Sequence, residues 1–482
     1  MSYEEIIEEN RQLKIENESI KFDLDSYKFR IAQLEKLIFG AKRERHTSSV
    51  DPAQLSLFDT PQQGEDQSAE QQVIYTRKKQ SAKSHPGRNE LPAHLPTDEV
   101  VIEPEELSED MVRIGEDVTE TLDYKPASLR KRRTVRPIYT EPSTDKIYQA
   151  PPVDRPLMKS IAESSLLAHI ITEKFVNHMP FYRKIQDFER QYDWRLSSST
   201  VNDWFREVCL LLERLYEELN RQVICGNYIQ MDESPIKVQD GKKKGKTHQG
   251  YMWVARNPIN GLVLFKYSRG RGQTKPNKML RNYSGYLQCD GYGVYDKIGK
   301  RSDIQLVGCM AHVRRKYHEA QKSDPQRSKF VLDIFRSIYL CERTIRNQSD
   351  ETLRSEKRGE IRILLKGLRD YIDEECTRVI PKSPLGKAMS YTIGQWSKLM
   401  AIFEDNRLEL DNNHIENKIR PLALGRKNYL FAGSHEGAER NAMMYSFMAS
   451  CKAKGVNPYT WLNKTLDVVA ETKLSRLAEL LP

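Results

Sequence analysis

Two aspartates in the sequence lie within or directly after runs of apolar residues. Asp232 interrupts the run Tyr228–Val238, and Asp290 follows the short run Tyr286–Cys289. A carboxylate in such a run is costly to bury, and two carboxylates that lie close together repel each other. A divalent cation offsets both costs, and Mg²⁺ takes such oxygen ligands together with waters and substrate phosphates. Taken singly, each aspartate also has a structural interpretation, as a strand-end ion pair for Asp232 and as a turn former before Gly291 for Asp290.

A third acidic residue, Glu416, lies in the segment Leu410–Pro421, three residues after the end of an Asp-Asn-Asn run. By spacing alone, Asn413 is an N-cap and Glu416, three residues later, completes a capping box at the start of a helix. The spacing therefore favours a structural role for Glu416. The chemistry that three clustered carboxylates offer is different: two bound cations can stabilise the attacking and leaving oxygens of a phosphoryl transfer.

The pattern of strands and helices predicts how the two aspartates are brought together. The predicted strands are Tyr228–Val238, Gln249–Arg256, Gly261–Ser268, Tyr286–Asp290 and Ile304–Gly308, and the predicted helices are Lys275–Asn282 and Met310–Gln321. Three antiparallel strands, a helix, a strand, and then a strand and a helix is the order of a ribonuclease H-like sheet. In that fold the first and fourth strands are neighbours, so we expect Asp232 and Asp290 to be adjacent.

Several segments resemble the insertion-sequence sixty-six family of transposases. They are YIQMDES, GYLQCDGYGVYD, VGCMAHVRRKYHEA and DNNHIENKIRPLALGRKNYLFAGSHEGAER, together with the leading heptad segment. The resemblance covers essentially the whole chain. It implies an acidic-triad catalytic core in which Asp232, Asp290 and Glu416 are the catalytic residues and hold two Mg²⁺ or Mn²⁺ ions. Asp232 is expected to bridge both ions, with Asp290 and Glu416 each holding mainly one.

A Cys-x-x-His pattern, Cys309 to His312, follows the second aspartate and matches a pattern shared by several transposase groups. We expect His312 to support the site or to contact the scissile phosphate. The alternative is a pair that packs in the core.

The resemblance also implies an activity and partners. The chain is expected to bind terminal inverted repeats of double-stranded DNA, to free a 3′-hydroxyl by hydrolysis and to join it to target DNA. Accessory transposition proteins are a further expectation. Two alternatives stay open: a catalytically inert DNA-binding regulator, and a metal-dependent nuclease without joining activity.

The N-terminal third predicts assembly and a linker. An apolar stripe that alternates by three and four through residues 1–40 predicts a coiled coil and thus a homodimer or higher oligomer, although a helix docked on its own protein has the same pattern. Residues 41–90 are poor in large apolar side chains and predict a flexible linker. Residues 91–150 predict a small β-rich module whose last strand runs from Leu129 to Ile138. Relatives usually carry a zinc-binding module there, but residues 1–208 contain no cysteine, so we expect no zinc.

The other segments complete an α+β multidomain chain. Residues 151–222 predict a helix-turn-helix-like DNA-binding region with helices Met158–Ile171 and Phe181–Tyr192 and a Ser-capped helix from Val201. The residues expected to contact the DNA bases in this region are Ser197–Thr200, Asn202 and Arg206. Residues 223–324 and 401–450 predict the two parts of the catalytic core. The long stretch between them predicts a helical insertion over 325–400, and residues 451–482 predict a C-terminal helical segment.

The charge and composition of the chain limit which binding partners and which cellular compartment are expected. With 77 Lys+Arg against 68 Asp+Glu, the net charge of +9 is compatible with nucleic-acid binding but does not establish it. The candidate DNA-binding residues are Arg130, Arg132, Arg133, Arg206, Lys243, Arg269, Arg271, Arg420, Arg426 and Lys427, and a solvated surface is the alternative for each. No apolar run is long enough for a membrane span, and seven scattered cysteines fit a reducing compartment. The cysteines and the absence of a membrane span predict a cytoplasmic protein, and the resemblance to the transposase family implies a bacterial one associated with the nucleoid.

Overall fold

The computed structural model describes residues 129–132, 138–141, 146–149, 155–158, 160–239, 245–345 and 351–482. The chain divides into two compact units, Met1–Tyr124 and Lys125–Pro482, and every described element belongs to the second. The predicted coiled coil, the linker and most of the β-rich module lie outside the described residues, as do Arg133 and Lys243. No helix within the described ranges is long and apolar enough to cross a membrane.

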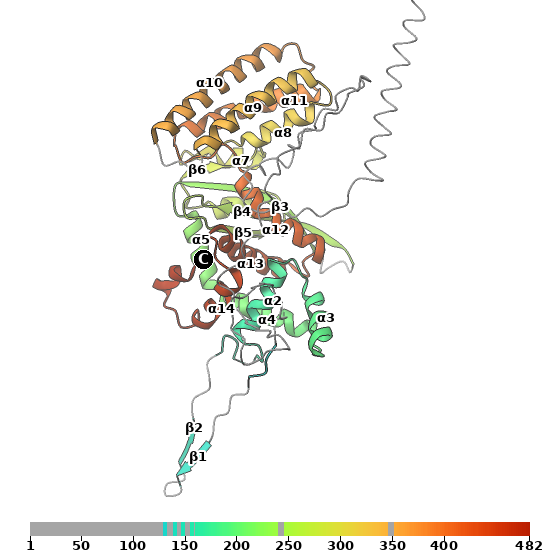
Figure 1. Cartoon of the computed structure of the whole chain (residues 1–482), viewed down its shortest axis with the longest axis vertical. Coiled ribbons are helices and arrows are strands. Elements are labelled where there is room, and N and C mark those ends of the chain that lie inside the picture. The colour runs from blue at the N-terminus through green and yellow to red at the C-terminus, as the bar shows by residue number, and fades with distance from the viewer. Residues whose placement is uncertain are drawn as a thin grey trace, which may run out of the picture. The chain divides into compact units, whose positions relative to one another are not determined.

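A five-stranded mixed sheet lies at the centre of the second unit (Figure 1). Its strands, in spatial order, are β5 (Val263–Ser268), β4 (Thr247–Arg256), β3 (Tyr228–Gln239), β6 (Gly285–Gln288) and β7 (Ile304–Val307). β3, β4 and β5 are antiparallel neighbours, whereas β6 runs parallel to β3 and β7 runs parallel to β6. The predicted strand order is confirmed, with the first and fourth strands in the chain side by side.

Short helices connect the strands of the parallel half. α6 (Thr274–Met279) precedes β6, α7 (Gly293–Ile298) follows Asp290, and α8 (Met310–Ala320) follows β7. Two of these were predicted within a few residues, but α7 was not. It is only six residues long and is flanked by Gly291 and Gly299, which obscure the helical pattern in the sequence.

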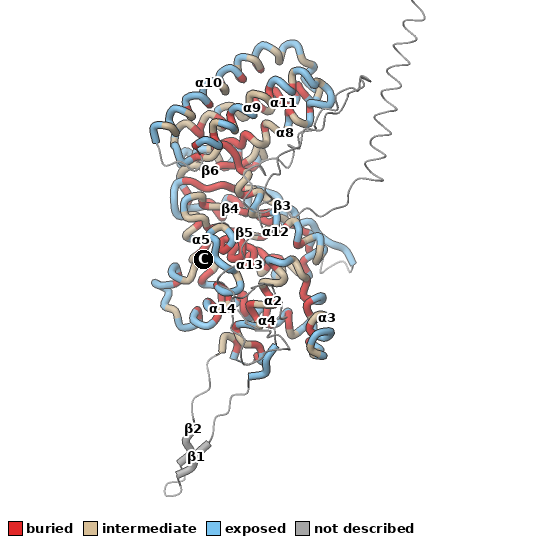
Figure 2. The backbone as a smooth tube through the Cα atoms, in the orientation of Figure 1, coloured by how far each residue is buried: buried red, intermediate tan, exposed pale blue. Residues whose placement is uncertain are grey.

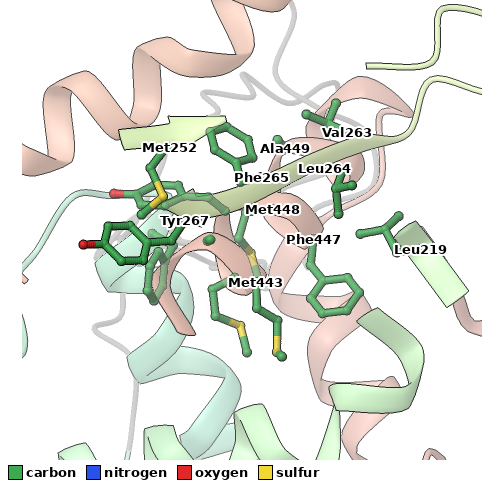
Figure 3. Packing of buried hydrophobic residues seen from close by; sticks show 14 of the residues in the cluster. Leu219, Met252, Val263, Leu264, Phe265, Tyr267, Met443, Phe447, Met448 and Ala449 are labelled. Atoms are coloured by element: carbon green, nitrogen blue, oxygen red, sulfur yellow. The ribbon is translucent and has the colours of Figure 1, made fainter. Parts of the chain in front are cut away.

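A long buried helix, α13 (His435–Ala453), packs against β5 and forms the centre of the first hydrophobic core. Buried residues occur on all its faces, as expected for a helix surrounded by other elements. Figure 3 shows the contact between Val263, Leu264 and Phe265 of β5 and Met443, Phe447, Met448 and Ala449 of α13. The sheet is therefore covered by a segment that follows the Glu416 motif in the chain.

Four helices precede the sheet: α2 (Ser164–Phe175), α3 (Phe181–Tyr192), α4 (Ser198–Leu211) and α5 (Glu213–Ile224). α3 has the predicted bounds, and Ser197 caps α4 as predicted, accepting a bond of 3.0 Å from the amide of Thr200. The prediction was wrong at two places. α2 begins at Ser164 rather than Met158, whose side chain is 77% exposed, and the single helix predicted from Val201 is broken at Leu212.

These helices do not form a separate folding unit. Phe175 of α2 contacts Phe205 of α4 and Tyr445 of α13, with ring centroids 5.5 and 5.0 Å apart. In the C-terminal segment, α14 (Pro458–Val468) packs against α2 and α13, and a short 3₁₀ helix, η3 (Leu474–Leu480), packs against α5. One hydrophobic core therefore joins the N-terminal helices, the sheet and the C-terminal segment.

The stretch in which a helical insertion was predicted contains α9 (Pro325–Ile345), α10 (Glu351–Glu375) and α11 (Pro384–Met400), followed by the 3₁₀ turn η2 (Ala401–Phe403). These helices share a second core with α8 and β7. Figure 2 shows buried inner faces and exposed outer faces on α9 and α10. The second core is thus built on the β7 side of the sheet.

A small hairpin precedes the helices. β1 (Ile138–Glu141) pairs antiparallel with β2 (Lys146–Gln149), with Tyr139 opposite Tyr148. Residues 129–132 have no regular structure, so the strand predicted from Leu129 is wrong at its start. Four successive basic residues from Arg130 to Arg133 repel one another along an extended chain, and this disfavours regular pairing there.

Candidate functional site

The register between β3 and β6 brings the two predicted aspartates together. The strands are parallel, and Gln230 of β3 lies opposite Gln288 of β6. Asp232 and Asp290 each follow their glutamine by two residues, so Asp232 lies within β3 and Asp290 just after β6, both directly beyond the residues that pair the two strands. Each carboxylate accepts a bond from the backbone that follows it: from the amide of Glu233 to Asp232 at 2.7 Å, and from the amide of Tyr292 to Asp290 at 2.9 Å.

Within the described residues, neither aspartate forms an ion pair. Burial raises the pKa of Asp232 well above its usual range, and the negative charges of Glu233, Asp290 and Glu416 raise it further. The carboxylates of Asp290 and Glu416 are thus near enough to Asp232 to disfavour its charged form.

A buried polar network fixes the two strands to the segment that leads to Glu416. Gln230 and Gln288 are fully buried, and the side-chain amide of Gln230 donates to Gln288 at 2.8 Å and to the carboxylate of Glu409 at 2.7 Å. The amide of Gln288 donates to the backbone carbonyl of Glu409 at 2.7 Å, and Tyr228 donates to Gln288 at 2.6 Å. Arg256 of β4 completes the network, 3.2 Å from Glu409.

The Asp-Asn-Asn run then positions the start of α12 (Asn413–Tyr429). Asn412 donates from its side chain to the carbonyl of Met231, the residue before Asp232, at 2.9 Å, and from its backbone to the thiol of Cys309 at 3.2 Å. Asp411 accepts from the amide of Asn413 at 2.9 Å. These bonds hold the first turn of α12, and hence Glu416, against β3 and the β7–α8 junction.

Glu416 faces α8 and does not cap its own helix. It lies 3.3 Å from Arg315 and 3.7 Å from the Nε2 atom of His312. The N-cap of α12 is Asn412, whose side chain forms no capping bond, so the capping box that spacing alone favours is wrong. Asn413 is already helical, because the Asp411 side chain takes over the capping of its amide.

His312 is placed beside Glu416, and its Nδ1 atom is buried without a partner among the described residues. Burial lowers the pKa of His312, and the nearby Glu416 opposes this shift. The ring therefore favours the neutral form, which can accept a proton or a hydrogen bond. Cys309 is tied to Asn412 instead, so the two residues of the Cys-x-x-His pattern contact different parts of the site.

A fourth carboxylate, Glu233, is the neighbour of Asp232 and has a side chain only 2% exposed. It accepts from Arg271 at 2.6 Å and from the hydroxyl of Tyr295 at 3.0 Å. Burial raises the pKa of Glu233, and the bond from Arg271 opposes the rise. The guanidinium of Arg271 also lies 4.0 Å from the ring centre of Tyr292, so this candidate DNA-binding residue is at the edge of the site.

The other candidate DNA-binding residues are less close to the carboxylates. Arg206 pairs with Asp203 of its own helix at 2.8 Å, and Arg132 lies 3.9 Å from Glu163. Arg130 and Arg269 are exposed. The structure does not gather these residues into one cluster with the acidic site.

The remaining candidates lie on α12. Arg420 and Lys427 are exposed, whereas Arg426 bonds to Ser234 of β3 at 3.0 Å. Arg426 therefore has a structural contact that the sequence pattern did not predict. In the described part of the chain, no group of three or more His, Cys, Asp or Glu side chains is close enough to enclose a metal ion as the side chains stand.

Sequence reasoning missed the residues that build the site around the triad, namely Gln230, Gln288, Glu409, Asn412 and Arg315. A signal for two of them was present: a Gln-x-Asp triplet occurs in both strands, with the polar glutamine in an otherwise apolar run. Buried glutamines need partners, so their repetition indicates a shared polar network.

Comparison with known families places the chain among the transposases. The model of the family described as "Transposase IS66 family" matches residues 159–440, and that of the "IS66 C-terminal element" matches 446–482. A third, described as "Transposase C of IS166 homeodomain", matches 26–100, outside the described residues. The chain belongs to the IS66 family of transposases, as the sequence motifs predict.

Relatives of similar length occur in Sinorhizobium fredii. The uncharacterized protein y4jD is 31% identical over 481 residues, which cover 94% of this chain and 93% of y4jD. The uncharacterized protein y4qI is 30% identical over 463 residues, which cover 91% of this chain and 84% of y4qI.

Proposed function

We propose that the chain is a metal-dependent DNA transposase that cuts at transposon ends and joins the freed 3′-hydroxyl to target DNA, using Asp232, Asp290 and Glu416. The observation that carries the proposal is geometric: the register of β3 and β6 brings Asp232 and Asp290 together, and the bond from Asn412 to Met231 holds the start of α12, which carries Glu416, against β3. Family membership supports the same activity. The strand order supports a ribonuclease H-like core.

The donor set fits a hard divalent cation such as Mg²⁺ or Mn²⁺. Asp232 is half-buried, forms no ion pair within the described residues and has its pKa raised by Asp290 and Glu416, and all the donors are oxygen atoms. When bound, such ions polarise a phosphodiester and stabilise the attacking and leaving oxygens. Asp232, Asp290 and Glu416 are the residues that would hold them.

The other side chains of the site have defined tasks in this proposal. Arg315 balances the charge of Glu416 and lets it approach Asp232 in the free protein. Neutral His312, with its partnerless Nδ1 atom, is available to accept a hydrogen bond near the attacked phosphate. Glu233 holds Arg271 at the edge of the site, where its guanidinium can bind a flanking phosphate in a bidentate manner.

The partners follow from the same proposal. Double-stranded DNA supplies both the element ends and the target, and residues 1–40 bring two or more copies together through a coiled coil. Two copies would hold both ends of one element at once. Accessory transposition proteins remain part of the proposal, and no zinc is required.

The test uses the full-length protein with duplexes that carry the ends of the element encoding it. With Mg²⁺ or Mn²⁺ we expect branched products in which an end is joined to target DNA, and with a chelator we expect none. Hydrolysed products alone would point to a nuclease without joining activity. If wild type and Asp232→Ala were equally inactive with every divalent ion, the chain would be a DNA-binding regulator.

A further inference from the structure

Two large apolar side chains lie on the surface directly after α12. Leu430 is 63% exposed and Phe431 is 41% exposed. They belong to the segment Asn428–Ser434, which is part of the family motif but has no task in the mechanism above. Adjacent exposed apolar residues in a charged surface indicate a contact with another molecule.

The backbone at Leu430 is strained. Its φ is 65° and its ψ is −49°, and the amide of Phe431 donates to the carbonyl of Tyr429 at 2.7 Å. This is a γ-turn of the rare kind, which is unfavourable for any residue with a branched side chain. Such strain persists only where the surrounding structure imposes it, and it is concentrated at functional sites.

The strand β3 imposes the turn. The amide of Ala432 donates to the carbonyl of Lys237 at 2.9 Å, and the amide of Gln239 donates to the carbonyl of Ala432 at 2.8 Å. Leu430 and Phe431 are therefore held between the end of α12 and the edge of the sheet. They form a rigid projection.

Cationic and aromatic side chains surround this projection. Arg183 of α3 donates to Asn428 at 3.1 Å and to the hydroxyl of Tyr182 at 3.0 Å, and Tyr182 is itself 52% exposed. Lys427, in the last turn of α12, and Lys237, whose carbonyl accepts from Ala432, are both exposed. Positive charges interleaved with exposed rings are complementary to a polyanion that carries stacked bases, which is the chemistry of a nucleic acid.

The projection lies at a defined distance along β3 from the carboxylates. Ala432 bonds to Lys237, which follows Asp232 by about five residues, or about 17 Å of strand. The same length spans about five base steps of a DNA duplex. A duplex cut at the acidic site and running along β3 would reach Leu430 and Phe431.

We propose that Leu430 and Phe431 form an apolar wedge that inserts into one base step of the bound DNA end, about five base pairs from the cleaved bond. Arg183 and Lys427 bind the flanking phosphates. Inserted apolar side chains unstack a step and kink the duplex, and this gives the cut strand room to reach the carboxylates. The inference rests on the proposed function, because it needs a chain that binds and cuts DNA.

The experiment uses the full-length protein and element-end duplexes with 2-aminopurine at successive positions, a base whose fluorescence rises when its neighbours unstack. Wild type should raise the fluorescence severalfold at one step. The double variant Leu430→Ala, Phe431→Ala should lose this rise while DNA affinity falls by no more than about tenfold, because the phosphate contacts remain. Ile363→Ala, at an apolar residue of α10 that is more exposed than either, should behave as wild type.

A fold check separates the wedge from a structural role. Leu430→Gly removes both the side chain and the strain, so it should melt at a higher temperature than wild type and still lose the fluorescence rise. The inference is overturned if the double variant keeps the rise, or if wild type binds and cuts the duplex with flat fluorescence at every position. It is also overturned if the double variant loses only self-association, which would assign the wedge to a second copy of the chain. If wild type neither binds nor cuts element ends, the proposed function fails first and the wedge with it.

Discussion

Asp232 is the residue at which the stability of the fold and the proposed activity are in conflict. It is half-buried, the negative charges of three other acids raise its pKa, and it has no ion pair within the described residues. Because its pKa is raised, protonation stabilises the folded state: that stability is fully present below the usual pKa of an aspartate and is lost as pH rises through the raised value. A cation that takes the place of the proton should bind more tightly as pH rises.

We therefore expect Asp232→Asn to stabilise the metal-free protein at neutral pH by on the order of 1 kcal/mol while strand transfer is lost. The gain should shrink as pH falls, because wild-type Asp232 is then protonated and equally neutral. Denaturant unfolding at several pH values, with Asp333→Asn on α9 as an exposed control, measures the effect. A variant that is less stable than wild type at every pH would mean that Asp232 has a partner that we have not identified.

Leu430 gives a second expectation at the residue scale. A positive φ costs a residue with a Cβ atom about 1 kcal/mol or more, and glycine avoids this cost. Leu430→Gly should therefore raise the free energy of unfolding by about 1 kcal/mol, less what glycine loses through its larger unfolded-state entropy. Chemical denaturation of wild type, Leu430→Gly and Leu430→Ala tests this. If the glycine variant is no more stable than the alanine variant, the turn is not strained in solution.

Among the elements, the segment before α12 connects the helices α9 and α10 to the helix that carries Glu416. Tyr339 of α9 donates to Asp411 at 2.8 Å, and Arg358 of α10 donates to the carbonyl of Leu408 at 2.8 Å. Both contacts lie within a few residues of the Asn412 bond to β3. The segment before α12 is thus bonded both to the inserted helices α9 and α10 and to strand β3 of the sheet.

Removing the Tyr339 hydroxyl should loosen this arrangement. We expect Tyr339→Phe to cost about 1 kcal/mol of stability and to lower the rate of strand transfer about tenfold, with little change in the affinity for DNA ends. Tyr459→Phe, on the exposed surface of α14, is the matched control. An unchanged rate with reduced stability would show that the hydroxyl supports only the fold.

The strands and most helices follow from the sequence because each is decided by local periodicity. β3, β4 and α3 have apolar spacing that only one kind of element satisfies. Glu416 could not be assigned from its neighbours, because the same spacing also fits a capping box. The position of Glu416 depends on the bonds from Asn412 to Met231 and Cys309. These bonds join residues that are far apart in the chain, so no local sequence pattern predicts them.

At the scale of the whole molecule, segments that look like separate domains in the sequence share cores. The helices α2 to α5 and the C-terminal α14 pack with the sheet, and Trp461 of α14 lies 5.1 Å from Phe447 of α13 between ring centres. The pattern of apolar residues along the sequence predicts which segments are helical, but it does not predict which hydrophobic core each helix packs into. The helices within residues 151–222, for which DNA binding was predicted, therefore also share the hydrophobic core of the sheet.

This sharing predicts the effect of truncation. A chain that ends at Ala453 lacks α14 and exposes the buried faces of α2 and α13, so the second unit should lose cooperative unfolding as a whole. Calorimetry of the truncated and full-length chains measures this. A truncated chain that melts as sharply as the full-length one would show that residues 454–482 form an independent appendage.

Whether three carboxylates from distant segments form one catalytic site is decided by the strand-transfer rates of single substitutions. Losing a residue that only orients a ligand typically lowers a rate by about 10–100-fold. We expect a larger loss of the strand-transfer rate for each of three variants: Asp232→Asn, Asp290→Asn and Glu416→Gln. Each should still bind DNA ends, and Glu319→Gln, exposed on α8, should keep the wild-type rate. Glu416 is the decisive member, because its local sequence also allows a structural role. A Glu416→Gln variant that joins DNA at the wild-type rate would contradict the account.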